Sequence, residues 1–330
     1  MENVSRATRG GVGTVLIGLA LVAVALTGGW LSGSIYDGHL AHPCEGCASS
    51  ASAAEARPTH VSHALAAAAT PTPKTSATPA DPTGFPYVSA QSFALIDSAC
   101  GALISGRDEH EHLPPASLTK LMTAAVALDH ASVTKMITSH VDGATLYNDT
   151  GSTIMGLKPG MELSLLDLLY GLLLPSGNDA AIAIAEGISG TQPVFVELMN
   201  EKAQSLALDD THFTNPHGLD EPGLYSSAYD MGMLARYVML NDTLRQIVST
   251  QSYQPKWDGP PVWNGNKLLT EYEGADGVKI GYTEQSEQTM VASATRGGRR
   301  IIASIMRSTD RYQDAERLLD WGFAQPSPCP

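Results

Sequence analysis

The sequence predicts an α/β (α+β) fold in which one antiparallel sheet is flanked by helices and carries an inserted, mainly helical lobe. Two observations lead to this prediction. Pairs of short apolar runs, typical of β-hairpins, lie near the start of the globular region and again near its end. Between them lie apolar stretches with helical spacing. Strands from both ends of this region are therefore expected to meet in a single sheet.

The predicted hairpins and helices follow one another along the chain. Residues 92–98 and 101–106 form the first hairpin. Residues 289–295 and 299–307 form the second, with glycines at its turn. The helical stretches are residues 117–130, 164–174, 178–188, 193–206 and 227–240, and residues 310–323 form the closing helix.

The composition is that of a globular protein with an acidic surface. A chain of 330 residues, 43% of them hydrophobic, can bury a large core. Its formal net charge of −14 argues against nucleic acid, or an anionic membrane surface, as the partner of the folded region. The expected partner is a small or neutral substrate, or a matrix. No nucleic-acid partner is expected.

The first forty residues have the pattern of a membrane segment. Arg6 and Arg9 precede an uncharged run over residues 10–36, which is long enough to cross a bilayer as a helix. We therefore predict an N-terminal anchor over residues 1–36, with its positive end in the cytoplasm. A cleaved signal peptide is the alternative. In either case the rest of the chain is exported, and it is anchored at the cell membrane or secreted.

A linker follows the predicted membrane segment. Residues 48–83 consist mainly of Ala, Ser, Thr and Pro with almost no large apolar side chains, so they cannot bury enough surface to fold. We expect residues 37–83 to tether a folded domain, residues 84–330, at some distance from the membrane.

Four cysteines in an exported chain allow up to two disulfides. Cys44 and Cys47 form a C-x-x-C, whereas Cys100 and Cys329 lie at the two ends of the folded region. These residues favour either two pairs, Cys44–Cys47 and Cys100–Cys329, or free thiols. Because the chain has no second C-x-x-C and no nearby paired histidines, neither a zinc site nor any other metal or cofactor is predicted.

One serine and one lysine stand three residues apart at the start of a predicted buried helix. In "PPASLTKLMTA", Ser117 directly precedes the apolar helical spacing, and Lys120 follows one turn later. Free backbone N–H groups and the positive end of the helix dipole favour a developing negative charge at such a serine. Ser132 and Lys135 repeat the spacing, but they lie just past the end of that helix. The alternative interpretation of Ser117 is a helix N-cap.

Two further elements carry groups that would complete a site around this pair. A lysine acts as a base near neutral pH only if burial and a second cation lower its pKa. Ser176 and Asn178 lie in a tight turn between two apolar helices, where their alternative role is capping the second helix. Lys279 and Gly281 point to one face of a strand, where the alternative is an edge strand with a solvated lysine.

Together, these elements resemble the penicilloyl-serine enzymes, whose motifs are S-x-x-K, S-x-N and K-T-G. Within that superfamily, "PPASLTKLMTA", "LLLPSGNDAA", "TNPHGL" and "DGVKIGYT" are similar to segments of the serine D-alanyl-D-alanine carboxypeptidases, the low-molecular-mass penicillin-binding proteins. The resemblance runs from Ser89 to Phe323. It implies a β-lactamase/transpeptidase-like fold and removal of the terminal D-alanine from peptidoglycan stem peptides, with β-lactam antibiotics as inhibitors.

The resemblance also implies a role for each matching residue. Ser117 would be the nucleophile, Lys120 the base, and Ser176 the relay of the proton to the leaving amine. The backbone N–H groups of Ser117 and Tyr282 would form an oxyanion hole, which typically contributes several kcal/mol at the transition state. The residues implied to bind substrate are Asn178, Lys279, Gly281, Tyr282 and Thr283. Water would then release the shortened peptide.

One position departs from the motif. Ile280 stands where the family has threonine, whose hydroxyl helps to receive the terminal carboxylate of the substrate. Loss of this hydrogen bond is expected to weaken recognition by about 1–3 kcal/mol, and Thr283 is the candidate to compensate. The chain also ends at Pro330, and we expect the N-terminal segment to replace the C-terminal anchor of many relatives.

Three other functions stay open on the sequence. A DD-endopeptidase of the same family would use the same residues. A class A-like β-lactamase needs a glutamate that activates water, for which Glu197 and Asn200 in "ELMN" offer a superficial match. A peptidoglycan-binding or sensor module would keep the fold with a weakened site, and only Ile280 supports it.

Overall fold

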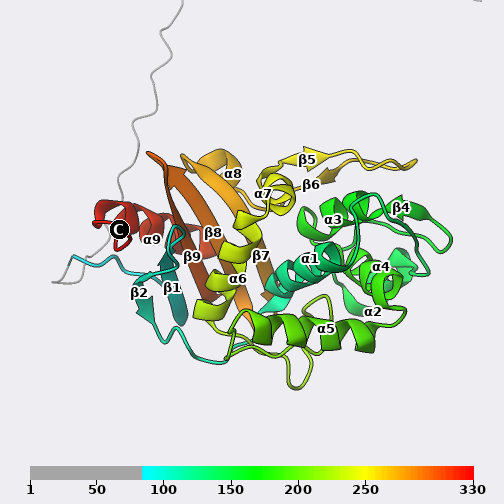
Figure 1. Ribbon diagram of the computed structural model, residues 1–330, viewed down its shortest axis with the longest axis horizontal. Coiled ribbons are helices and arrows are strands. Elements are labelled where there is room, and N and C mark those ends of the chain that lie inside the picture. The colour runs from blue at the N-terminus through cyan, green and yellow to red at the C-terminus, as the bar shows by residue number, and fades with distance from the viewer. Residues whose placement is uncertain (1–83) are drawn as a thin grey trace, which may run out of the picture. The chain divides into compact units, whose positions relative to one another are not determined.

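The computed structural model describes residues 84–330 (Figure 1). Its centre is a five-stranded antiparallel sheet with the strand order β2-β1-β9-β8-β7. Both predicted hairpins are confirmed, and β1 pairs with β9, so the two ends of this region meet in one sheet as expected. The strands are β1 (Ser92–Asp97), β2 (Leu103–Arg107), β7 (Ala275–Thr283), β8 (Glu287–Arg296) and β9 (Arg299–Ser308).

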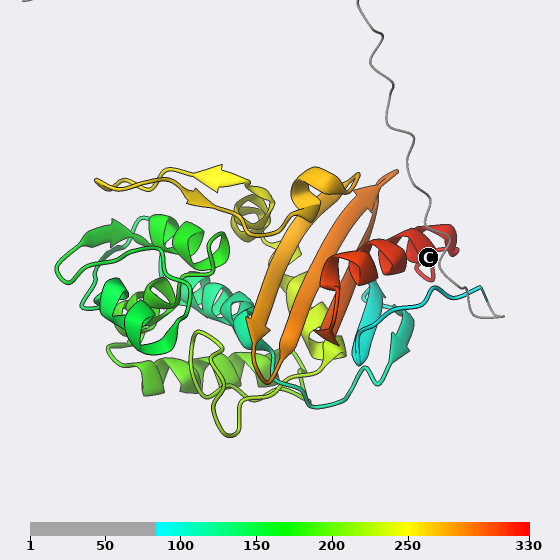
Figure 2. The same ribbon diagram turned by 180° about the vertical axis from the view of Figure 1, so that it is seen from behind.

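Helices cover both faces of the sheet. Figure 2 shows the closing helix, α9 (Arg311–Ala324), across one face, and Figure 1 shows α6 (Ala228–Leu240) across the other. In β1, Phe93 and Leu95 belong to the core under α9, whereas Ile96 belongs to the core on the opposite face. Because side chains of both orientations are buried, β1 and β9 read as nearly continuous apolar runs.

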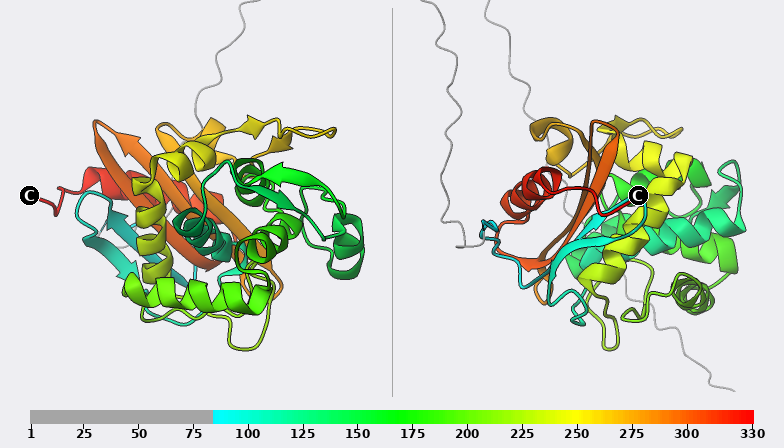
Figure 3. Two further views of the ribbon diagram at one scale, coloured as in Figure 1. Left: turned by 45° about the vertical axis from the view of Figure 1, so that its right-hand side comes forward. Right: turned by 60° about the vertical axis from the view of Figure 1, so that its left-hand side comes forward.

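The helices predicted between the hairpins form a helical lobe beside β7, seen from two sides in Figure 3. They are α1 (Thr119–His130), α3 (Leu165–Leu173), α4 (Asn178–Ser189) and α5 (Gln192–Ser205). α1 is the central helix, because it contacts α3, α4 and α5 within the lobe and α6 on the sheet. All the predicted helices, including α6 and α9, are confirmed.

Several short elements have no counterpart in the sequence predictions. Segments of this length contain too few repeats for periodicity to reveal them. Local caps start the two longer ones: the side chain of Asp142 caps α2, and that of Asn241 caps α7. These elements are α2 (Gly143–Thr150), α7 (Asp242–Ser249), α8 (Leu268–Glu271) and two strand pairs, β3 (Met136–Thr138) with β4 (Glu162–Ser164) and β5 (Ser252–Tyr253) with β6 (Val262–Trp263).

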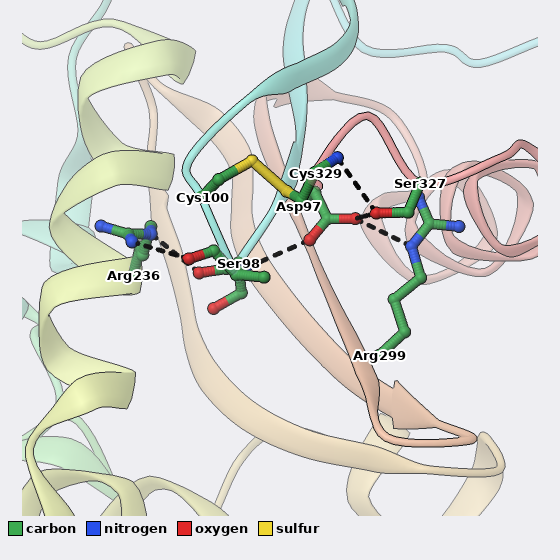
Figure 4. Close-up of a disulfide and its surroundings, with 8 residues drawn as sticks. Asp97, Ser98, Cys100, Arg236, Arg299, Ser327 and Cys329 are labelled. Atoms are coloured by element: carbon green, nitrogen blue, oxygen red, sulfur yellow. Dashed lines mark hydrogen bonds and ion pairs between the residues drawn. A yellow bond between two sulfur atoms is a disulfide. The ribbon is translucent and has the colours of Figure 1, made fainter.

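A disulfide joins the two ends of the described region (Figure 4). Cys100, in the turn between β1 and β2, is bonded to Cys329 near the C-terminus. Beside it the buried carboxylate of Asp97 pairs with Arg299 at 2.8 Å and accepts a hydrogen bond from Ser327. For these two cysteines the predicted pairing is therefore confirmed.

The predictions for the anchor, residues 1–36, and the linker, residues 37–83, lie outside the described residues, as do those for Cys44 and Cys47. Among residues 84–330, no helix combines the length and the apolar character needed to cross a bilayer. An N-terminal anchor stays a prediction.

Candidate active site

Ser117 lies in a 3₁₀ turn that leads directly into α1. The turn spans Ala116–Leu118, and the α-helix begins at Thr119. The N-cap positions of the turn and of the helix are Pro115 and Leu118, and neither makes a side-chain capping bond. The hydroxyl of Ser117 therefore does not cap the helix, and the N-cap interpretation is wrong.

Lys120 is the hydrogen-bonding partner of Ser117. Its Nζ lies 2.9 Å from the Oγ of Ser117 and 2.6 Å from the carbonyl oxygen of His217. Lys120 is completely buried. Burial, and then the charge of Lys279, lower the pKa of Lys120 well below its usual value, while Asp179 opposes the shift. A lysine whose pKa is lowered in this way gives up its proton more readily than a free lysine, so its amine is suited to accept the proton of the serine hydroxyl.

Lys279 is the second cation that a basic lysine requires. It lies on β7, is 2% exposed, and donates a 3.0 Å hydrogen bond to the carbonyl oxygen of Ile280. Burial and the neighbouring charge of Arg311 lower the pKa of Lys279 to about 7. Although β7 is the outermost strand of the sheet, its lysine is buried, so the interpretation as a solvated lysine is wrong.

Ser176 lies in the turn between α3 and α4, and Asn178 is the first residue of α4. The N-cap of α4 is Gly177, so the interpretation that Ser176 or Asn178 caps this helix is wrong. Ser176 has a φ of 68°, and its Oγ is buried with no hydrogen-bond partner among residues 84–330. Such a hydroxyl is costly to bury without a partner, which favours a role in binding or proton transfer.

Asp179 fixes the turn before α4 by binding the neighbouring segment, residues 155–157. Its buried carboxylate accepts hydrogen bonds of 2.8 Å from the backbone N–H groups of residues 155–157. Just before that segment, the carbonyl oxygen of Thr153 accepts a 2.9 Å hydrogen bond from the backbone N–H of Asn178. The segment and the start of α4 therefore form one unit, which presents Ser176 and Asn178 together.

β7 passes very close to Ser117. A side chain at Gly281 would place its Cβ 3.0 Å from the backbone nitrogen of Ser117 and 2.4 Å from the hydroxyl oxygen of Thr289. Only glycine permits this approach. The approach brings the backbone of Ser117 near that of Tyr282, whose N–H group is the other predicted oxyanion donor.

A cavity of about 700 Å³ opens at Ser117. Lys120 and Lys279 do not line it, because both are buried in its wall. A cavity of this size accommodates a short peptide segment. The predicted site residues that line it are Ser117, Ser176, Asn178, Gly281, Tyr282 and Thr283, together with Ile280.

Three residues of the site have no counterpart in the sequence predictions. Arg311, the first residue of α9, lines the cavity and donates a 2.5 Å hydrogen bond to the carbonyl oxygen of Gly281. Its buried Nε has no partner in the described part of the chain. His217 and Asp220 line the cavity from the loop 214–221. Burial and the charge of Lys120 lower the pKa of His217 to about 3, so its imidazole is neutral.

The sequence gives a local indication for His217 but none for Arg311. His217 lies in "TNPHGL", a segment that the family resemblance had already marked. Nothing in the pattern singles out Arg311, which is 30 residues beyond Gly281 in the chain and reaches the cavity only through the packing of α9.

The groups around the cavity suit acyl transfer. They supply a hydroxyl beside a buried amine of lowered pKa, a strand backbone that passes close to the backbone of Ser117, and the guanidinium of Arg311 on the cavity wall. Within residues 84–330, His, Cys, Asp and Glu side chains form no group of three or more suited to a metal ion.

Comparison with known proteins gives a consistent result. A family described as D-alanyl-D-alanine carboxypeptidase matches residues 75–310. The D-alanyl-D-alanine carboxypeptidase DacD of Escherichia coli (strain K12) is 39% identical over 249 residues, which is 72% of this chain and 64% of that protein. The chain thus spans slightly less than two thirds of the length of this relative.

Solved structures share the fold. Penicillin binding protein 6B from Escherichia coli is similar with a TM-score of 0.68 at 38% identity, over 72% of this chain and 78% of that one. The Streptomyces K15 DD-transpeptidase is similar with a TM-score of 0.69 at 29% identity, over 73% of this chain and 99% of that one. The expected β-lactamase/transpeptidase-like arrangement of sheet and helical lobe is therefore confirmed.

Proposed function

The chain belongs to the D-alanyl-D-alanine carboxypeptidase family, and we propose that it is a serine DD-carboxypeptidase that removes the terminal D-alanine from peptidoglycan stem pentapeptides. The observation that carries this proposal is the 2.9 Å contact between Ser117 and a fully buried Lys120, at the wall of a cavity that accommodates a short peptide.

The first step is attack of the Ser117 hydroxyl on the carbonyl of the penultimate D-alanine. Neutral Lys120 takes the hydroxyl proton as the new C–O bond forms. The carbonyl oxygen becomes anionic, and the N–H groups of Ser117 and Tyr282 stabilise it. The Ser176 hydroxyl, which has no other partner in residues 84–330, relays the proton to the amine of the departing D-alanine. The product is an acyl-enzyme on Ser117.

Water completes the reaction. Once the terminal D-alanine has left, Lys120 is again neutral and takes a proton from a water molecule that attacks the ester. The Ser117 oxygen leaves and recovers its proton, and the shortened stem peptide is released. A β-lactam follows the first step through its own amide and stays bound as the acyl-enzyme, so β-lactam antibiotics are proposed as covalent inhibitors.

The terminal carboxylate of the substrate is assigned to Arg311 and Lys279. Ile280 has no hydroxyl to offer, whereas a guanidinium forms strong charge-assisted hydrogen bonds with a carboxylate. Arg311 lines the cavity, and its Nε has no hydrogen-bond partner among the described residues. Arg311 therefore offsets only part of the loss of the usual threonine. Asn178 is assigned to the amide of the substrate on the other side of the scissile bond.

The catalytic domain is proposed to lie outside the cytoplasm, at the cell membrane. The uncharged run over residues 10–36 supports an N-terminal anchor, or secretion if the segment is cleaved. The disulfide between Cys100 and Cys329 supports export, because disulfides persist in oxidising compartments.

The alternatives have less support. A class A-like β-lactamase needs Glu197 and Asn200 at the cavity, but neither lines it, and Asn200 instead exchanges hydrogen bonds with the backbone of Phe213. A binding or sensor module does not require the whole constellation of Ser117, Lys120 and Ser176. A DD-endopeptidase uses the same residues, so only the choice of substrate separates it.

The direct test offers three substrates to the full chain in detergent. These are a diacyl-Lys-D-Ala-D-Ala peptide, the same peptide with its C-terminus amidated, and a cross-linked peptide dimer. We expect D-alanine release from the first and little cleavage of the second, because Arg311 and Lys279 recognise a carboxylate. Cleavage confined to the dimer would establish an endopeptidase, and no cleavage by a folded protein would overturn the proposal.

A further inference from the structure

We propose that Asp220 is a positioning residue that fixes the end of β7 beside the nucleophile, an inference that rests on the proposed function. Asp220 lines the cavity from the loop 214–221. Its Oδ1 accepts a 2.8 Å hydrogen bond from the hydroxyl of Thr283, the last residue of β7. Its Oδ2 accepts a longer hydrogen bond, 3.4 Å, from the backbone N–H of Gln285 in the following turn.

The same loop is anchored on the side of the nucleophile. The carbonyl oxygen of His217 accepts the 2.6 Å hydrogen bond from Lys120. Gly218, with a φ of 89°, packs so closely that a Cβ at this position would lie 1.8 Å from the carbonyl oxygen of Ala116. The loop therefore connects the turn that carries Ser117 to the end of β7, and Asp220 makes the second of these connections.

The end of β7 is held from one side by β8 and by Ser286, whose hydroxyl accepts a 2.9 Å hydrogen bond from the backbone N–H of Thr283. β7 pairs with β8, and no strand among residues 84–330 pairs with its outer edge. Tyr282, whose N–H group is an oxyanion donor in the proposed mechanism, directly precedes Thr283. A shift of Thr283 would therefore move this N–H group away from the reacting carbonyl oxygen, and small displacements of such donors reduce the rate strongly.

The contact with Asp220 also determines what the Thr283 hydroxyl can do. Its single proton has two acceptors, the carboxylate of Asp220 at 2.8 Å and the hydroxyl of Ser286 at 2.9 Å, and the charged acceptor is the stronger. The Thr283 oxygen in turn accepts a hydrogen bond from the backbone N–H of Ser286 at 3.0 Å. Thr283 thus acts through the position of β7 and does not replace the missing threonine hydroxyl at Ile280.

Four variants of the full chain test this inference: Asp220→Ala, Asp220→Asn, Thr283→Val and the double variant Asp220→Ala with Thr283→Val. Glu221→Ala is the matched control, because Glu221 accepts hydrogen bonds from Thr214 and Asn215 inside the same loop. For each variant, kcat and KM of D-alanine release, the rate of acylation by a fluorescent penicillin, and the melting temperature are measured.

Asp220→Ala is expected to lower kcat and the acylation rate by about 10- to 100-fold with little change in KM. The reason is that a displaced Tyr282 N–H group would stabilise the transition state less well. Thr283→Val should show the same loss, and the double variant no more than either alone. Asp220→Asn should keep most of the activity, because its amide oxygen still accepts the Thr283 proton. Glu221→Ala should stay within about twofold of the unaltered chain.

Several results would overturn the inference. An unchanged kcat in Asp220→Ala, or additive losses in the double variant, would remove the link through Thr283. An effect on KM alone would make Asp220 a substrate ligand. Equal losses of activity and melting temperature in Asp220→Ala and Glu221→Ala would reduce the effect to loosening of the loop. An unaltered chain that neither releases D-alanine nor takes up penicillin would contradict the proposed function itself, which is a different failure.

Discussion

The amine of Lys120 lies 2.9 Å from the hydroxyl of Ser117, and the lysine is completely buried. A charged ammonium in this position would be costly, because burial and the neighbouring Lys279 both favour the neutral form. The pair therefore brings a hydroxyl together with an amine whose lowered pKa favours loss of its proton, which suits the proposed roles of nucleophile and base. In the proposed mechanism, Lys120 must be neutral when it activates Ser117.

Replacing Lys120 with arginine removes the base and keeps a cation. Arginine does not lose its proton near neutral pH, so we expect acylation by a fluorescent penicillin to slow by about 100- to 10,000-fold. Lys135→Arg is the control, because Lys135 repeats the spacing with Ser132 but is exposed. Fast acylation of Lys120→Arg would refute the role of Lys120 as the base.

The pKa of Lys279, about 7, predicts the alkaline limb of the pH profile. In the proposed mechanism, recognition of the substrate carboxylate requires the protonated form of Lys279, which is lost as the pH rises through this pKa. The value of kcat/KM should therefore decline above neutrality with an apparent pKa of about 7. Lys279→Arg keeps the charge and should move this decline to higher pH. A profile that stays flat well into the alkaline range would contradict the assignment.

Restoring the usual residue at Ile280 should improve the enzyme. Ile280→Thr supplies a hydroxyl donor to the substrate carboxylate, and we expect kcat/KM to rise about tenfold. Ile280→Val has nearly the same shape without the hydroxyl, so it should give no such gain. Steady-state kinetics on one peptide decides the matter, and equal values for the two variants would mean that the carboxylate does not contact this position.

The disulfide is expected to act on stability and not on catalysis. Cys100 and Cys329 are separated by 229 residues in the chain and do not line the cavity. Replacing both with serine should lower the free energy of unfolding by about 2–5 kcal/mol, because the unfolded chain regains conformational freedom. Denaturant titration measures this loss. Activity under native conditions should be unchanged, and a variant of unchanged stability would contradict the expectation.

Much of the fold was predictable because its main elements are long and regular. The glycine turn of the second hairpin and the apolar spacing that begins after Ser117 identify β8, β9 and α1 from local residues alone. Helix α7 was not predicted, because eight residues are too few to show a helical period. Its start depends on the side chain of Asn241, which caps it. Local sequence therefore identified the elements that build the core.

The site was predictable only where a motif marked it. Ser117, Ser176 and Lys279 each carry a local pattern, although only the structure excluded their capping or solvated alternatives. Arg311 and Asp220 lie outside these patterns, and their importance arises from contacts with Gly281 and Thr283 that form when distant segments pack together. These two residues belong to the site because the fold brings them close to it, and their residue types alone would not have identified them.

The most direct test of the central claim is D-alanine release from a diacyl-Lys-D-Ala-D-Ala peptide by the full chain, measured beside Ser117→Ala. We predict release by the unaltered chain and none by the variant, with both proteins folded to the same extent. Release that persists in Ser117→Ala, or a folded unaltered chain that releases no D-alanine, would contradict the assignment of Ser117 and Lys120 as the nucleophile and its base.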